Sequence, residues 1–292
     1  MHLFIFGAGY SGQEIARRLS PSAERIGGTT RSQTSFNALK VAGISPFLFD
    51  GSAFGPELAA ELRTVTHILL SISPDGGGDP VLPFVTNRTL IDAMPALQWM
   101  GYLSTVGVYG DHGGDWVSEA TPPKPVSERS IRRVEAEEAW LAFGRATGKT
   151  VMIFRLAGIY GPGQNALVNL REGTAKRLVK PGQVFNRIHV EDIAGCIAAG
   201  LDRPRAGAVW NVTDDEPAPP QDVVTFAAEL LGMEPPPEQA FETAELSPMA
   251  RSFYGENKRV SNAATKAELG WRLRYPTYRE AHRALLAQGD ET

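Results

Sequence analysis

Short apolar runs alternate with amphipathic stretches along the first half of the chain. Residues 3–6 form a continuous apolar run, as expected of a parallel strand that is buried on both faces. We expect further strands at 25–30, 44–49, 67–72, 99–103 and 151–156. Apolar residues at helical spacing lie between them. This alternation predicts an α/β fold, a Rossmann-type doubly wound parallel sheet.

The pattern is less regular beyond residue 160. We expect a helix within 165–180, helices at 191–201 and 221–231, and strands at 183–190 and 209–212. A proline-rich segment at 234–248 is expected to cross the surface. Earlier in the chain, helices are expected at 81–94 and 127–147.

The first strand ends in a G-x-G-x-x-G motif at residues 7–12, and a helical pattern begins directly after it. Strand, glycine turn and helix in this order form the dinucleotide-binding fingerprint. Gly7 permits the tight turn, Gly9 lets a pyrophosphate approach the backbone, and Gly12 lets helix and strand pack closely. The predicted cofactor contacts here are Gly7, Gly9, Tyr10, Ser11 and Gly12. The alternative is a connection that binds nothing.

The end of the second predicted strand indicates which dinucleotide is bound. Thr30, Arg31 and Ser32 lie there, and no acidic residue occurs between positions 26 and 35. NAD sites usually carry an acid at this place, whereas an arginine accommodates the 2′-phosphate of NADP. We therefore predict NADP rather than NAD; the alternative is a solvated arginine at a helix start. Asp50, after the third strand, is placed to accept from the adenine amino group.

The next strands bring further polar residues to the same edge of the sheet. Ser71 and Ser73 follow the fourth strand, and residues 104–110 follow the fifth. Ligands of open α/β sheets bind beyond the carboxyl ends of the strands. We expect the cofactor to lie against these residues.

Composition narrows the class of protein and partner. The formal net charge of −4 over 292 residues gives no reason to expect nucleic acid or an anionic membrane as partner. No apolar run reaches membrane-spanning length, and the five histidines are too scattered for a metal site. The single cysteine, Cys196, excludes an internal disulfide and fits a reducing, cytoplasmic compartment.

Several motifs occur in an order that resembles the extended short-chain dehydrogenase/reductase superfamily, the NAD(P)-dependent epimerase/dehydratase group. They are the glycine motif, STVGVYG at 104–110, RLAGIYGPG at 155–163, RIHVEDIA at 187–194, WNVTDDE at 210–216 and ELGW at 268–271. The spacing of the glycines is similar to the atypical branch of this superfamily. The resemblance covers nearly the whole chain.

The resemblance implies a domain division and a set of site residues. Residues 1–160, with 183–213 contributing, would form the Rossmann domain, and 161–292 a small α+β substrate lobe. A homodimer through the long helix is also implied. The residues implied to lie near the nicotinamide or the substrate are Ser104 or Thr105, Tyr160, Asn87, Lys258 and Arg259. His189 and Asp192 match a segment that ties the C-terminal part to the Rossmann domain, a structural role.

The resemblance fails at the pair of residues that carries the family's chemistry. The family has Tyr-x-x-x-Lys on the long helix, where the tyrosine is the acid/base. Aligned on Glu137, this chain has Arg129 at the tyrosine position and Arg133 at the lysine position. Arg133 could still bind ribose hydroxyls. Arg129 cannot shuttle a proton near neutral pH, because the pKa of a guanidinium is above about 12.

Three explanations follow from this break. Tyr109 could be the acid/base, unless it packs under its loop. Arg129 and Arg133 could instead bind an anionic substrate while hydride transfer proceeds without a tyrosine. The third explanation is a non-catalytic NADP-binding sensor or regulator. The leading hypothesis is an NADP-dependent oxidoreductase or epimerase that acts on a hydroxyl or carbonyl of a small substrate, such as a nucleotide sugar or a phosphorylated compound.

Overall fold

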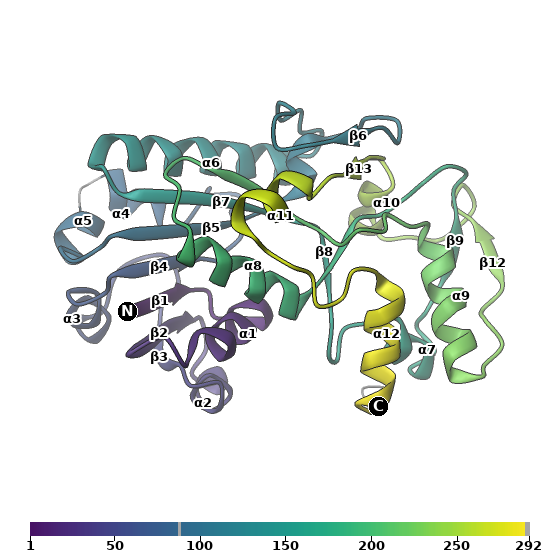
Figure 1. The fold of residues 1–292 in the computed structure, drawn as a ribbon, viewed down its shortest axis with the longest axis horizontal. Coiled ribbons are helices and arrows are strands. Elements are labelled where there is room, and N and C mark those ends of the chain that lie inside the picture. The colour runs from purple at the N-terminus through teal and green to yellow at the C-terminus, as the bar shows by residue number, and fades with distance from the viewer. Residues whose placement is uncertain (87–88, 290–292) are drawn as a thin grey trace.

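The central sheet confirms the predicted fold class. In the computed structural model, which describes residues 1–86 and 89–289, seven parallel strands lie in the order β3-β2-β1-β4-β5-β7-β11 (Figure 1). Their bounds are β1 His2–Phe6, β2 Arg25–Thr30, β3 Ser45–Leu48, β4 His67–Leu70, β5 Trp99–Thr105, β7 Thr150–Leu156 and β11 Val209–Val212. All residues of β1 are buried, which explains its unbroken apolar run. The strand order reverses between β1 and β4. The segments that follow these two strands therefore run in opposite directions along the sheet, and a crevice opens between them.

Helices cover both faces of the sheet. One face packs against α1 (Tyr10–Leu19), α2 (Phe36–Val41) and α8 (Val190–Asp202) through a continuous apolar core. The other face packs against α3 (Pro56–Leu62), α4 (Leu82–Thr86), α5 (Thr89–Ala93) and α6 (Glu128–Thr147). Figure 1 shows α6 and α8 on opposite sides of the strands. The long helix begins at the side-chain cap Ser127 and ends at the left-handed Gly148, as its sequence predicts.

The C-terminal part forms a smaller body beside the carboxyl ends of the sheet (Figure 1). Its helices α7 (Ala166–Arg171), α9 (Pro220–Leu231) and α12 (Tyr278–Ala287) share an apolar core. Three short parallel pairs complete it: β8 (Gly158–Tyr160) with β10 (Arg187–His189), β9 (Arg177–Val179) with β12 (Glu238–Ala240), and β6 (Trp116–Val117) with β13 (Arg259–Val260). Helices α10 (Pro248–Phe253) and α11 (Ala263–Leu269) flank β13 along the chain.

The helix expected within 165–180 is confirmed as α7, and it ends at Arg171 because Gly173 adopts a left-handed φ of 69° and the chain turns into β9. Two other predictions in this second half were wrong. The strand expected at 183–190 is confined to Arg187–His189, since the Val184 N–H donates to the Asn257 side chain and not to a strand. β12 was missed because its three residues are exposed and carry no apolar signal.

Within the parts of the chain that the structure describes, none of the helices has the length and hydrophobicity that a bilayer crossing requires.

Candidate functional site

The N-terminus of α1 has the features that a dinucleotide pyrophosphate needs. No side chain caps this helix, so the first N–H groups of α1 face outward from the glycine turn. A Cβ added at Gly9 would meet no atom within 4 Å, whereas one at Gly7 would lie 2.8 Å from Ile72 Cγ1. A Cβ at Gly12 would lie 3.2 Å from Ile5 Cγ2. The turn is therefore closely packed at Gly7 and Gly12 and open at Gly9, where a pyrophosphate could approach the backbone. These features fit the implied cofactor.

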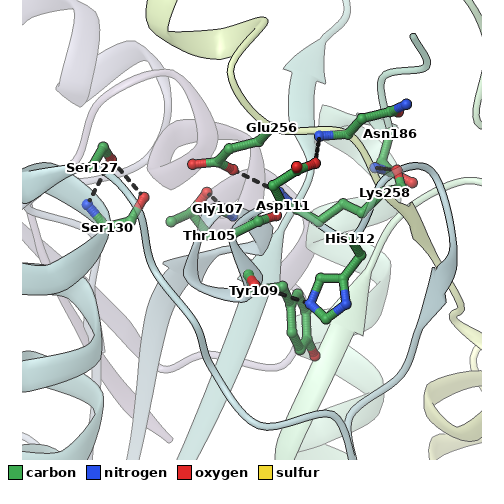
Figure 2. Close-up of polar contacts among 12 residues, drawn as sticks. Thr105, Gly107, Tyr109, Asp111, His112, Ser127, Ser130, Asn186, Glu256 and Lys258 are labelled. Carbon is green, nitrogen blue, oxygen red and sulfur yellow. Dashed lines mark hydrogen bonds and ion pairs between the residues drawn. The ribbon is translucent and has the colours of Figure 1, made fainter. Parts of the chain in front are cut away.

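A cavity of about 740 Å³ extends from this helix toward the C-terminal body. Its walls come from the start of α1, the carboxyl ends of β4 and β5, the first turns of α6, and the C-terminal segments around β10 and α10. Figure 2 shows polar side chains from this region, with Thr105 and Gly107 drawn between the Ser127–Ser130 pair and Lys258. Of the predicted site residues, the cavity is lined by Ser11, Ser71, Ser73, Ser104, Thr105, Arg129, Arg133, Tyr160 and Lys258.

The two hydroxyls at the end of β5 have different surroundings. Ser104 is 3% exposed, and its Oγ donates to Glu137 Oε1 at 2.5 Å. Glu137 is held in turn by the Arg155 guanidinium, with Nη2 to Oε2 at 2.7 Å. Thr105 Oγ1 accepts from the Gly107 N–H at 3.1 Å, and it donates no hydrogen bond within the described residues. Thr105 is therefore the hydroxyl with a proton available to a ligand.

The two arginines of α6 contact different parts of the site. Arg133 donates from Nη1 to the Leu103 carbonyl at 2.5 Å, and its Nη2 bonds to Ser73 Oγ. It thus joins the ends of β5 and β4 beside the cavity. Arg129 is exposed, and its guanidinium lies 4.7 Å from the centre of the Phe253 ring on α10. This contact links the Rossmann part to the C-terminal body across the cavity.

Two serines at the start of α6 were missed by the sequence analysis. Ser130 is buried and lines the cavity, and Ser127 Oγ donates to Ser130 Oγ at 2.9 Å (Figure 2). A Cβ at Gly107 would lie 3.0 Å from Ser130 Oγ, which places this hydroxyl next to the turn after Thr105. Ser130 precedes Arg133 by one helical turn, and that spacing could have identified it.

The residues that are predicted to contact the adenosine end of the cofactor lie on an open surface outside the cavity. Arg31 is exposed directly after β2 and makes no ion pair or hydrogen bond within the described residues. Thr30 Oγ1 accepts from the Ser32 N–H at 3.3 Å. Asp50 accepts from both the backbone and the hydroxyl of Ser52, and these bonds lower the pKa of its carboxyl. Arg31 is therefore available to an anion that the protein does not supply.

Comparison with known proteins shows which families and structures the chain resembles. A model of the NAD dependent epimerase/dehydratase family matches residues 83–213. Over these residues the chain is similar to this family. A functionally unknown conserved protein from Silicibacter pomeroyi is 48% identical, with a TM-score of 0.90 and 98% of each chain covered. Protein YeeZ of Escherichia coli is 29% identical over 93% of this chain and 95% of its own length.

More distant solved structures share the fold. The dTDP-glucose 4,6-dehydratase of Bacillus anthracis, solved in complex with NAD, has a TM-score of 0.78 at 21% identity, covering 99% of this chain and 98% of the other. The family name states a dependence on NAD. This confirms the broader prediction of a nicotinamide dinucleotide, while the choice of NADP stays a prediction.

The environment of Tyr109 argues against its predicted acid/base role. Its side chain is fully buried, and the hydroxyl donates to Asn211 Oδ1 at 2.7 Å, outside the lining of the cavity. The Arg155 guanidinium lies 4.8 Å from the ring centre. Burial raises the pKa of the Tyr109 hydroxyl. Tyr109 is a packing residue, which is the alternative interpretation given above.

Three other predicted residues have contacts that limit their roles. Lys258 lines the cavity, but Nζ is held by Glu256 at 2.6 Å and by the Gly110 carbonyl at 2.8 Å. Arg259 bonds to the Gly114 carbonyl and does not line the cavity, contrary to its predicted contact with substrate. Asn87 lies outside the described residues.

Tyr160 and Tyr10 are both held by contacts with other parts of the chain. Tyr160 lines the cavity, but its ring is stacked on His282 with 5.6 Å between ring centres, and burial raises the pKa of its hydroxyl. Tyr10 donates from its hydroxyl to the Pro162 carbonyl at 2.9 Å. This bond joins α1 to the chain that follows β8.

Asp192 has the structural role expected from its motif. Its carboxylate accepts from the Arg274 N–H at 2.5 Å and from the Tyr275 N–H at 3.1 Å. His189 caps α8 through a bond from the Glu191 N–H at 3.3 Å. These bonds hold the C-terminal segment against the helix that packs on α1.

Proposed function

We propose that the protein is an NADP-dependent oxidoreductase or epimerase-like enzyme that acts on a hydroxyl or carbonyl group of a small molecule. The observation that carries this proposal is the Thr105 hydroxyl, which has a proton to donate and lies in the cavity beside the α1 turn. In this proposal residues 1–160, with 183–213, hold the cofactor, and residues 161–292 bind the substrate.

The chain's own residues supply the positioning and polarisation. When bound, the nicotinamide supplies or accepts a hydride at its C4 carbon. Thr105 donates a hydrogen bond to the substrate oxygen and stabilises negative charge that develops there. Arg133, which bonds to the Leu103 carbonyl and to Ser73 at the ends of β5 and β4, would bind the ribose hydroxyls. Ser127 and Ser130 form a hydroxyl pair along which a proton from solvent reaches the cavity, in place of the missing tyrosine.

The preference for NADP rests on Arg31. A guanidinium that is unpaired at the end of β2 can form two parallel N–H bonds to a 2′-phosphate. The neighbouring Thr30 and Ser32 hydroxyls add possible donors. We further propose a cytoplasmic location, in accord with the single, buried Cys196, and a homodimer through α6, where Ile131 is 43% exposed.

Replacement of Thr105 tests the enzymatic proposal. In a screen for NADPH oxidation with carbonyl substrates, Thr105→Val is expected to lower kcat by about 10²–10³-fold, as loss of one hydrogen-bond donor to a developing oxyanion does. Thr105→Ser keeps the hydroxyl and the bond from Gly107, so it should retain most of the activity. Equal turnover by Thr105→Val and the wild type would refute the role of this hydroxyl.

A second candidate function is a non-catalytic NADP-binding sensor. The absence of a tyrosine from α6 favours it, because the family's acid/base position holds Arg129. A protein that binds NADPH tightly but oxidises it with none of the carbonyl substrates would support this function.

A further inference from the structure

Arg187 begins β10 and lines the part of the cavity that the C-terminal body supplies. One side of its guanidinium is fixed by the backbone. Nη1 donates to the Phe185 carbonyl and to the Ala218 carbonyl, both at 3.0 Å. The orientation of the group is therefore set before any ligand arrives.

The other edge of the same guanidinium has no partner. Nε and Nη2 of Arg187 donate no hydrogen bond within the described residues. This edge is the one that Arg155 uses to bind Glu137, with Nε 3.1 Å from Oε1 and Nη2 2.7 Å from Oε2. Two parallel N–H groups on one edge match the two oxygens of a carboxylate. Arg187 thus presents a carboxylate-binding edge without a carboxylate from the protein.

Arg187 also has no ion-pair partner among the described residues. No carboxylate of the described chain lies within 4.0 Å of its guanidinium, whereas the buried cation of this wall, Lys258, is paired with Glu256. Asp214 is the acidic group that interacts with Arg187, but it does not contact the guanidinium, and burial raises the pKa of its carboxyl. Arg187 is half-buried, so part of its hydration is lost, and an anionic ligand would offset that cost.

Three aromatic side chains lie near Arg187 in the cavity wall, beside the paired Lys258 and Glu256. Phe185 and Tyr254 form an edge-to-face pair with 5.1 Å between ring centres, and Phe253 lies one residue before Tyr254. These rings suit the carbon skeleton of a ligand better than a second charged group. A ligand at this place would have one carboxylate and an apolar body.

We propose that Arg187 binds the carboxylate of the substrate, and that the substrate is an organic acid whose hydroxyl or carbonyl group lies at Thr105. The assignment of the reacting group rests on the proposed function, whereas the carboxylate site rests on Arg187 alone. A carboxylate and a phosphate share the ability to bind a guanidinium, so the experiment separates them.

The test measures binding to the protein saturated with NADPH or NADP, without requiring turnover. Aliphatic and aromatic oxoacids and hydroxyacids are titrated by calorimetry, each beside its methyl ester and the matching phosphate monoester. We expect at least one acid to bind, and its ester to bind about 30-fold more weakly or worse. Binding by the phosphates and not the acids would overturn the proposal, as would no binding by any acid.

Variants of Arg187 locate the site. Arg187→Met is expected to weaken binding of the acid by about 30-fold or more and to leave the affinity for its ester unchanged. Arg187→Lys keeps the charge but loses the bidentate edge, so its affinity should lie between those of Arg187→Met and the wild type. The matched control is Arg177→Met, which removes an arginine of the same body outside the cavity. Undiminished acid binding in both Arg187 variants would refute the assignment.

The two proposals can fail separately. Acid binding that depends on Arg187 but gives no NADPH oxidation or NADP reduction would contradict the enzymatic function and leave the carboxylate site intact. Turnover of an uncharged carbonyl compound, unaffected by Arg187→Lys, would support the enzymatic function and contradict the carboxylate site. Thermal denaturation of each variant shows whether loss of the two Nη1 bonds has unfolded the C-terminal body; Arg187→Lys and the acid–ester comparison in the wild type remain informative in that case.

Discussion

Removal of one charge from the buried Glu137–Arg155 pair should destabilise the protein strongly. Both side chains are about 5% exposed, and the Arg155 guanidinium makes three hydrogen bonds to the carboxylate. Glu137→Gln would leave a buried guanidinium without its counter-charge. Such a loss costs about 3–5 kcal/mol in proteins, which corresponds to a drop in Tm of about 6–10 °C for a chain of this size.

A double-mutant cycle measures whether the cost comes from the pair. The cycle uses Glu137→Leu and Arg155→Met. Each alone should destabilise by a similar amount, and the double variant should recover much of the loss, because apolar side chains of similar volume replace both charges. Denaturation by urea at pH 7 gives the free energy of unfolding for each variant. Glu128→Gln is the control on the same helix, since it breaks the exposed pair with Arg132 and should cost less than about 0.5 kcal/mol.

The result that would refute this reasoning is a Glu137→Gln cost no larger than that of Glu128→Gln. It would mean that Arg155 finds another partner or solvent when Glu137 is neutral. The pair also holds Ser104, so Ser104→Ala should lower Tm and leave dinucleotide binding unchanged.

Two further predictions concern the turn and a buried histidine. Gly9→Val should leave Tm nearly unchanged, because its Cβ meets no atom within 4 Å, but should abolish dinucleotide binding in calorimetry; tight binding by this variant would contradict the pyrophosphate site. Burial lowers the pKa of His282 to about 4, so the unfolded chain binds a proton below about pH 6.5 that the folded chain excludes. Its contribution to stability is therefore complete above pH 6.5 and is lost as the pH falls toward 4. Between pH 7.5 and pH 5 the wild type should lose about 2 kcal/mol more than His282→Gln, and equal losses on urea denaturation would contradict this.

The sequence predicted the Rossmann sheet and the glycine turn because their signals are local. The apolar run of β1, the turn at 7–12 and the helical pattern after it lie within about twenty residues, and each is set by backbone geometry. The end of the long helix at Gly148 was predictable for the same reason.

The roles of single site residues depend on contacts between distant segments. Tyr109 was placed at the correct edge of the sheet, but its hydroxyl bonds to Asn211, about a hundred residues further on. The sequence could not show which of Ser104 and Thr105 faces Glu137. Arg187 lay within a quoted motif, yet its fixed and vacant edges follow from the carbonyls of Phe185 and Ala218.

The most direct test of the account is calorimetric titration of NADPH, NADP and NAD into the purified wild type and Arg31→Ala. We predict tight binding of NADPH and NADP to the wild type, with NAD weaker. Arg31→Ala should lose affinity for the phosphorylated cofactors and keep its affinity for NAD. Failure of the wild type to bind any of the three would contradict the site at Gly7–Gly12, and an unchanged preference for NADP in Arg31→Ala would contradict the role of Arg31.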